Sequence, residues 1–423
     1  MKIENLNRES TKKKVKLKIL FLSIFLFNLS WGLETVSLKE VLNEVANKNP
    51  EILAAKKVWE AKKAEVPAAW ALEAPMIGIM WEEIPDNFDL SRAFHESYTI
   101  QQNIPFPGKL LLQRKKAVNE KNAFQEEYQE KRREILTQVK RTYYQYYFGL
   151  KAMEVIHHHV EILKNFSKIT QTQYMVGKAS QPDVLKIQVE LGLMSNELLE
   201  TDQRLTIAVS RLNILMNRAV NAPLHFPEEI TKDSLKYDLT RLQNLAQEKR
   251  PQINAFKFQL EKSQAQVNLA KWNYTPDFMV KLGRVVPRFG FRGWDFEVQA
   301  SLPLWFLQKE NSELRLAQRE KEESQALLHN SQNMVALEVQ EAYIILKTKE
   351  RIFELYKNSI LPQALQALEA ATQSYQTEKV DFLTLLDSER SLKDIELGYY
   401  QALVDYQEAF ANLELAVGVD LRE

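Results

Sequence analysis

The chain has 423 residues, of which 45% are hydrophobic and 26% are charged, and its 56 basic residues equal its 56 acidic ones. This balance gives no reason to expect a nucleic-acid partner. Cysteine is absent, which excludes disulfides, thiolate metal sites, a cysteine nucleophile and a lipid-modified cysteine. With only 11 glycines and 14 prolines, long uninterrupted helices are plausible.

Residues 1–32 have the pattern of a cleaved signal peptide. A basic segment, 12–18, precedes an apolar stretch, 19–29, that is too short to span a bilayer as a helix. Small residues at 30 and 32 predict cleavage after Gly32, and an uncleaved membrane anchor is the alternative. Later segments lack the roughly 20 apolar residues of a transmembrane helix, so we expect a periplasmic, secreted or outer-membrane protein.

The segment 76–106 alternates between apolar and polar residues. Ile77 and Ile79 share one face of a predicted strand, and after a turn-like segment Tyr98 and Ile100 share one face of another. Such alternation fits antiparallel strands that lie between lipid and water. A half-buried hairpin of a soluble protein is the alternative.

Helices are predicted on both sides of this hairpin. Ser37 and Glu40 have capping-box spacing at the start of the mature chain. After the hairpin, apolar residues recur at steps of seven, four and three over 109–176, which predicts one helix with a near-heptad coiled-coil seam. Such a helix is on the order of 100 Å long, more than a globular core requires. A second helix returns over 182–218.

The sequence is duplicated at one constant offset. Pro50 matches Pro251, Tyr174 matches Tyr375, and the same offset pairs Leu185 with Leu386 and Leu212 with Leu413. We therefore divide the chain into a first copy, 33–220, a linker, 221–238, and a second copy, 239–423. The second copy is expected to contain strands over 277–304, a long helix over 308–377 and a returning helix over 382–418. Pro362 is expected to kink or restart the long helix.

Four strands per chain cannot close a barrel, and open sheet edges are not tolerated in lipid. The chain is therefore expected to oligomerise if the strands enter a membrane. Three chains would supply about twelve strands, which is within the range of known barrels.

The duplicated order of helix, hairpin, very long helix, turn and returning helix resembles the TolC-like outer-membrane efflux family. The tips at 174–185 and 375–387 carry the most specific likeness, and residues 104–109 and 302–304 at the barrel exits also resemble the family. The resemblance implies a mainly α-helical fold, in which each chain of a homotrimer gives four strands to a transmembrane β-barrel and its helices to a periplasmic tunnel. It also implies outer-membrane lipid, a periplasmic adaptor protein and an inner-membrane pump as partners.

The resemblance further implies a constriction just after the second tip, where the family places two acidic residues three apart. Those positions here are Thr384 and Asp387. One carboxylate is kept and one is replaced by a hydroxyl, so we expect one carboxylate ring of three Asp387 per trimer, which favours cations. Asp381 at the turn is expected to add charge at the mouth. A solvated residue near a helix N-terminus is the alternative for Asp387.

The tips are expected to dock the adaptor. The implied docking residues are Val176, Gly177, Lys178, Ala179 and Asp183 in the first tip and Glu378, Lys379 and Val380 in the second. The third position of the family's Val-Gly-Leu pattern is Lys178 here, and Glu378 stands where glycine is usual. Gly177 is also explained as a helix C-cap.

The run His157–His159 invites a metal interpretation, but consecutive helical residues point about 100° apart, so we expect exposed helix residues instead. We expect no cofactor, no metal site and no catalytic residue. The sequence thus predicts an outer-membrane channel of a tripartite efflux system that conducts passively. The alternatives are a channel for type I protein secretion and a periplasmic coiled-coil structural protein without a pore.

Overall fold

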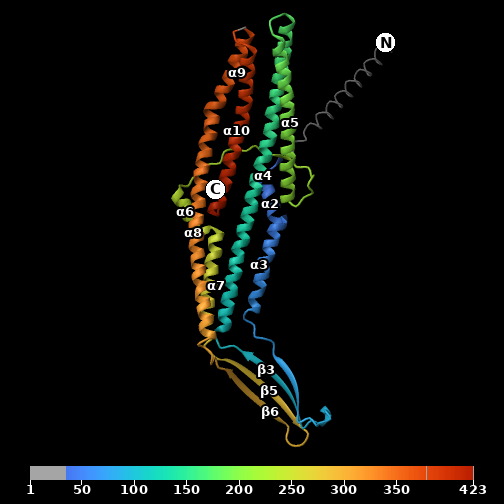
Figure 1. The fold of residues 1–423 in the computed structure, drawn as a ribbon, viewed down its shortest axis with the longest axis vertical. Coiled ribbons are helices and arrows are strands. Elements are labelled where there is room, and N and C mark those ends of the chain that lie inside the picture. Colours follow the sequence, from blue (N-terminus) through green and yellow to red (C-terminus); the bar gives the residue numbers. More distant parts are fainter. Residues whose placement is uncertain (1–34, 378, 423) are drawn as a thin grey trace, which may run out of the picture. The chain divides into compact units, whose positions relative to one another are not determined.

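The computed structural model describes residues 35–377 and 379–422 of the chain. The predicted signal peptide, residues 1–32, and Glu378 lie outside the described residues. The described chain is mainly α-helical and contains a four-stranded antiparallel sheet, which confirms the predicted fold class (Figure 1). Among the described helices, none combines the length and the apolar content that crossing a bilayer requires.

The first half of the chain follows the expected order of elements. These are α2 (Leu38–Lys48), α3 (Pro50–Ala68), β2 (Met76–Glu82), η1 (Leu90–Arg92), β3 (His95–Ile104), α4 (Lys109–Met175) and α5 (Gln181–Leu215). The capping box before α2 is formed: the Ser37 amide donates to the Glu40 carboxylate at 3.0 Å, and the Glu40 amide donates to the Ser37 hydroxyl at 3.2 Å. α4 is continuous over 67 residues.

The second half repeats this order. It contains α6 (Leu239–Lys249), α7 (Pro251–Trp272), β5 (Asp277–Pro287), β6 (Gly293–Ser301), α8 (Lys309–Leu355), the π-helical turn η2 (Tyr356–Ile360), α9 (Leu361–Gln376) and α10 (Phe382–Val417). The offset between Pro50 and Pro251 also separates both bounds of α2 from those of α6, and the end of α4 from the end of α9. The duplication seen in the sequence therefore recurs in the backbone.

The second long helix differs from α4 because it is interrupted at Pro362. Proline has no N–H and its ring clashes with the carbonyl one turn earlier. The π turn η2 ends two residues before Pro362. In this turn, the Leu361 amide donates to the carbonyl of Tyr356, five residues earlier. The α-helical hydrogen-bond pattern is thus replaced by a π turn where the sequence predicts a kink or a restart.

The sheet has the strand order β2-β3-β5-β6. Its register aligns Ile77, Ile100, Leu282 and Phe296 in one row across all four strands, and each of these side chains is exposed. The next row, of which Gly283 is a member, is small or polar. Within the described chain, β2 and β6 are each paired on one side only. Among the residues that the structure describes, the sheet therefore has an exposed apolar row and two open edges.

The described helices pack as two compact units, each with segments of both sequence copies. One unit contains residues 35–45, 139–232 and 354–404, apart from residue 378, and the other contains residues 46–138, 233–353 and 405–422. The core of the first includes Ile156, Leu163, Ile187, Met194, Phe382, Leu385 and Leu386. The core of the second includes Leu242, Ile253, Val335, Leu346, Tyr406, Phe410 and Leu413.

The first part of the linker, residues 221–232, is held against α4 in the first unit. Its short strand β4 (Phe226–Pro227) pairs in parallel with β1 (Thr35–Val36). The Tyr143 hydroxyl accepts a hydrogen bond from the Glu228 amide at 3.2 Å, and the Tyr147 hydroxyl donates to Glu229 at 2.7 Å. Burial raises the pKa of Tyr143 to about 12, so this phenol stays neutral.

Candidate functional site: the tips and the start of α10

The second tip leads into α10, where the predicted constriction residues lie. The Asp381 carboxylate accepts hydrogen bonds from the Thr384 hydroxyl at 2.6 Å and from the Thr384 amide at 2.9 Å. Asp381 therefore caps the helix. The Thr384 hydroxyl, and then its amide, hold the pKa of the Asp381 carboxyl below its usual value. This residue is negatively charged at neutral pH.

The first turns of α10 have one buried face and one exposed face. Phe382, Leu385 and Leu386 are buried in the core of the first unit, whereas Thr384 and Asp387 are exposed. Their spacing of three places these two side chains on the same side of the helix. The geometry fits the predicted pair, and the role of the pair in a pore stays a prediction.

The first tip ends α4 with a helix C-cap. Gly177 has φ +76°, and the Lys178 amide donates to the carbonyl of Gln173 at 2.8 Å. A Cβ added at Gly177 would have no atom within 4 Å, so glycine is required here for its backbone conformation rather than for space. Val176 and Lys178 are exposed, and Ala179 is partly exposed.

Asp183 lies in the first turn of α5, the returning helix of the first tip. The Ser180 amide and hydroxyl donate to its carboxylate at 3.1 and 2.7 Å, which gives Asp183 a structural role as a capping residue. In the second tip, the Lys379 amide donates to the carbonyl of Ser374 at 2.9 Å, which is the equivalent of the Lys178 bond in the first tip. Lys379 is exposed, whereas Val380 packs against the core.

A hydrogen bond joins the two tips. The Tyr375 hydroxyl donates to the Gln173 side chain at 2.7 Å. Tyr375 is 8% exposed, whereas its sequence equivalent, Tyr174, is 48% exposed. The second tip is thus attached to the first tip through a side chain whose counterpart is left at the surface.

Sequence reasoning missed a buried charge cluster between α4 and α10. His157 and His158 are exposed as expected, but for His159 the expectation of an exposed side chain is wrong, because that side chain is fully buried. Its Nδ1 lies 2.8 Å from Glu389 and its Nε2 lies 3.0 Å from Glu396. The signal was available: His159 lies four residues from the buried Val155 and Leu163, so these three residues share the buried face of α4. The two glutamates lie seven residues apart on one face of α10.

The two carboxylates decide the charge of His159. Burial alone would lower the pKa of the imidazole, but the hydrogen bonds that it donates to Glu389 and then to Glu396 outweigh burial and raise this pKa to about 9. The side chain is therefore an imidazolium at neutral pH, and both of its N–H groups donate to carboxylates. Within the described chain, no group of three or more His, Cys, Asp or Glu side chains is arranged to hold a metal ion.

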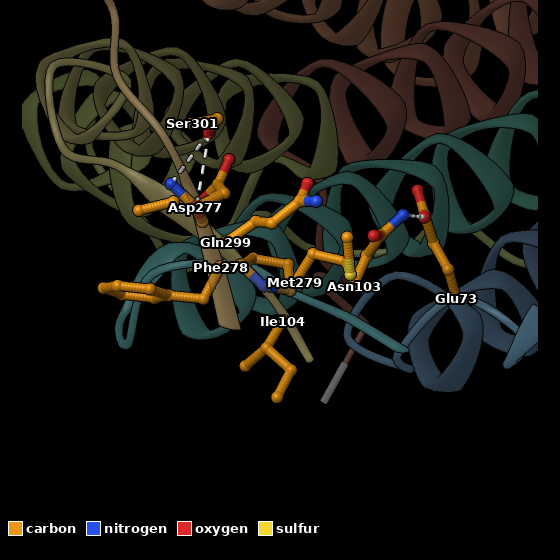
Figure 2. Close-up of a pocket in the computed structure, with 10 residues that line it drawn as sticks. Glu73, Asn103, Ile104, Asp277, Phe278, Met279, Gln299 and Ser301 are labelled. Carbon is orange, nitrogen blue, oxygen red and sulfur yellow. Dashed lines mark hydrogen bonds between the residues drawn. The ribbon is translucent and has the colours of Figure 1, made fainter. Parts of the chain in front are cut away.

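The junction between the sheet and the helices contains a cavity of about 360 Å³, which Figure 2 shows. Asn103 donates to the Glu73 carboxylate at 3.0 Å across it, and Ser301 is hydrogen-bonded to the backbone of Asp277. Beside it, the buried Lys109 forms an ion pair with Asp277 at 2.8 Å. These contacts join the start of β5 to the end of β6 and to the start of α4, and give the cavity a structural explanation.

A family model described as outer membrane efflux protein matches the chain twice, at residues 41–218 and at residues 242–419. The two matches are separated by the same offset as the duplicated helices. The cobalt-zinc-cadmium resistance protein CzcC of Cupriavidus metallidurans is 22% identical over 386 residues, which cover 90% of each chain.

The solved structures of the outer membrane protein VceC and of CusC, which is described in connection with transmembrane channel formation, have the same fold. VceC of Vibrio cholerae aligns with a TM-score of 0.76 at 16% identity, over 91% of this chain and 96% of its own. CusC aligns with a TM-score of 0.77 at 14% identity, over 90% of this chain and 92% of its own.

Proposed function

The chain belongs to the outer membrane efflux protein family, and we propose that three copies form a passive tube across the periplasm and the outer membrane. Membership confirms the resemblance drawn from the tips. It also makes the protein an efflux channel component and not an enzyme, as expected. In the proposal, an inner-membrane pump supplies the energy, and a periplasmic adaptor binds the tips.

The observation that carries this proposal is the sheet. Its exposed row of Ile77, Ile100, Leu282 and Phe296 is an apolar face that water would solvate poorly. Its edge strands β2 and β6 leave backbone groups that require partners in lipid. Both needs are met if β6 of one copy pairs with β2 of the next until a barrel closes.

Cross-linking tests the closure. Because the chain has no cysteine, a variant with Ile79→Cys on β2 and Val298→Cys on β6 carries only those two thiols. A short bifunctional thiol reagent should convert this variant into covalent trimers. As a control, Ile100→Cys with Leu282→Cys, which face each other within one sheet, should link internally and stay monomeric. Monomers from both variants in outer-membrane extracts would contradict the trimer.

We propose that Asp387 supplies the constriction with one ring of carboxylates. The proposal is supported by the position of Asp387, which lies with Thr384 on the exposed face of α10. Replacing Asp387 with alanine should reduce cation selectivity and block by multivalent cations in planar bilayers, because the ring loses its charge. Asp387→Glu is the matched control and should keep both. Unchanged single-channel behaviour of Asp387→Ala would remove this residue from the mechanism.

We propose divalent metal cations as the cargo class to test first, because the relative CzcC is described as a cobalt-zinc-cadmium resistance protein. Cells without the gene should become sensitive to these metals, and the gene on a plasmid should restore resistance. Unchanged metal tolerance together with loss of a secreted protein would favour the protein-secretion alternative.

A further inference from the structure

The start of α10 carries the proposed constriction, and the same segment contacts a buried cation on α4. Glu389 lies two residues after Asp387 and is itself fully buried. Its Oε1 contacts His159, and its Oε2 is buried without a hydrogen bond among the described residues. Because a buried carboxylate without a counter-ion is strongly destabilising, Glu389 depends on the charge of His159.

A second carboxylate, that of Glu396, fixes the orientation of the imidazolium ring. Glu396 binds the opposite nitrogen of the imidazolium, and its side chain is 21% exposed. A ring held through both nitrogens by residues two turns apart cannot rotate or slide without losing one bond. The cluster therefore fixes the axial position of α10 on α4.

The cations of α10 near the cluster are paired with α5. Arg390 forms an ion pair with Glu190, and Lys393 contacts Glu197 at 2.7 Å. Arg390 also attracts the Glu389 carboxylate electrostatically, but the Arg390 guanidinium donates its hydrogen bond to Glu190. These two cations therefore leave the hydrogen bond to Glu389 to another group.

The neighbours on α4 and η2 do not supply that hydrogen bond either. The ring of His158 packs edge-on against His159, and Lys151 is paired with two glutamates, one of α4 and one of the linker. From η2, the Tyr356 phenol lies against α10 at Gly398. Among the described residues, the imidazolium of His159 is thus the hydrogen-bonded partner of the buried carboxylate.

We propose that His159 is a positioning residue for the constriction: it acts as a buried ionic clamp that holds the first turns of α10, and with them Thr384 and Asp387, against α4. This inference rests on the proposed function. It adds a residue outside the pore face that decides where the pore-facing residues lie.

The clamp has a defined pH range. The pKa of His159 in the folded chain, about 9, lies above the ordinary value of 6.5, so the contribution of the clamp is complete below about pH 6.5. It is lost as the pH rises through about 9, because the imidazole then loses the proton that one of the two carboxylates requires. An uncharged packing residue at this position would show no such range.

A nitroxide label tests the clamp without relying on conductance. Because the chain has no cysteine of its own, Leu383→Cys places a single label on the exposed face of α10 beside Thr384. The label should be immobile at neutral pH and become mobile as the pH rises through about 9. With His159→Gln it should be mobile from pH 6 upward without a step. His157→Gln is the matched control and should keep the step, because His157 is exposed.

A milder variant guards against misfolding. Glu396→Gln leaves His159 and Glu389 in contact and should move the step to a lower pH, since one of two carboxylates that raise the pKa is lost. A wild-type label without a step between pH 8 and 10, or a step that persists in His159→Gln, would overturn the clamp.

Conductance of the same proteins links the clamp to the pore. His159→Gln should change single-channel conductance at pH 7 several-fold, and wild type should approach that value above pH 9. A wild-type protein that conducts identically to His159→Gln at every pH overturns this inference alone. A wild-type protein that does not conduct at all removes the proposed function instead.

Discussion

The two tips occupy equivalent places in the duplicated sequence, yet they bury different residues. Tyr375 is buried and bonded to the first tip, whereas Tyr174 is exposed. Leu386 is 2% exposed in the core of the first unit, whereas its equivalent Leu185 is 52% exposed. The second tip is therefore held by its own chain, whereas the equivalent side chains of the first tip are exposed.

The two long helices that lead to the tips also differ from each other. α4 is continuous and carries the charged His159, whereas the equivalent position in the second copy is Ile360, the last residue of the π turn. A duplication has thus produced one unbroken helix and one interrupted helix. The residues proposed for the constriction lie on α10, the helix that the unbroken α4 binds through the charge cluster.

The largest expected difference between the tips is at the two leucines. Leu386→Ala should lower the free energy of unfolding by about 3 kcal/mol, because it leaves a cavity in the core. Leu185→Ala, its matched control, should change the unfolding of a dissociated chain by less than about 0.5 kcal/mol. Denaturant unfolding in detergent measures both. Equal losses in the two variants would contradict the comparison.

The two tyrosines test the hydrogen bond between the tips. Tyr375→Phe should cost about 1 kcal/mol, because it leaves the Gln173 side chain without its partner while keeping the ring buried. Tyr174→Phe should be close to neutral, since that phenol is exposed. The readout is again denaturant unfolding, and a neutral Tyr375→Phe would show that this bond does not hold the tip.

The C-cap glycine gives an effect of similar size to that of the tyrosine. Gly177→Ala should destabilise by about 1 kcal/mol, because alanine is strained at φ +76° although there is space for its Cβ. Gly192, inside α5 and equally uncrowded, is the control. Gly192→Ala should stabilise by roughly 0.5–1 kcal/mol, since alanine favours a helix interior. Thermal unfolding should therefore move in opposite directions for the two variants.

Much of the backbone was predictable because local chemistry marks its boundaries. Pro50 begins a helix, Gly177 ends one, and Pro362 lies two residues after the π turn that interrupts another. The alternation of Ile77 and Ile79 predicted a strand, and the strand has the expected exposed face. Each of these signals lies within a few residues of the feature that it predicts.

Burial that depends on distant segments was not predictable. Leu185 and Leu386 have the same sequence pattern, and only the contacts of their neighbours decide that one is exposed. For His159, the spacing of four from Val155 and from Leu163 indicates burial. Its partners, Glu389 and Glu396, lie 230 and 237 positions later, so its ion pairs were not predictable. Histidine is treated as a polar residue when a hydrophobic pattern is read. A histidine whose two ring nitrogens are paired with carboxylates is nevertheless buried like a core residue.

The linker has a consequence for the order in which the chain folds. The hydroxyls of Tyr143 and Tyr147 are bound by residues 82 to 85 positions later, at Glu228 and Glu229. While the first copy emerges alone during synthesis, these aromatic side chains have no linker to cover them. A chaperone that recognises exposed aromatic residues therefore has a defined interval in which to act, and that interval ends when the linker arrives.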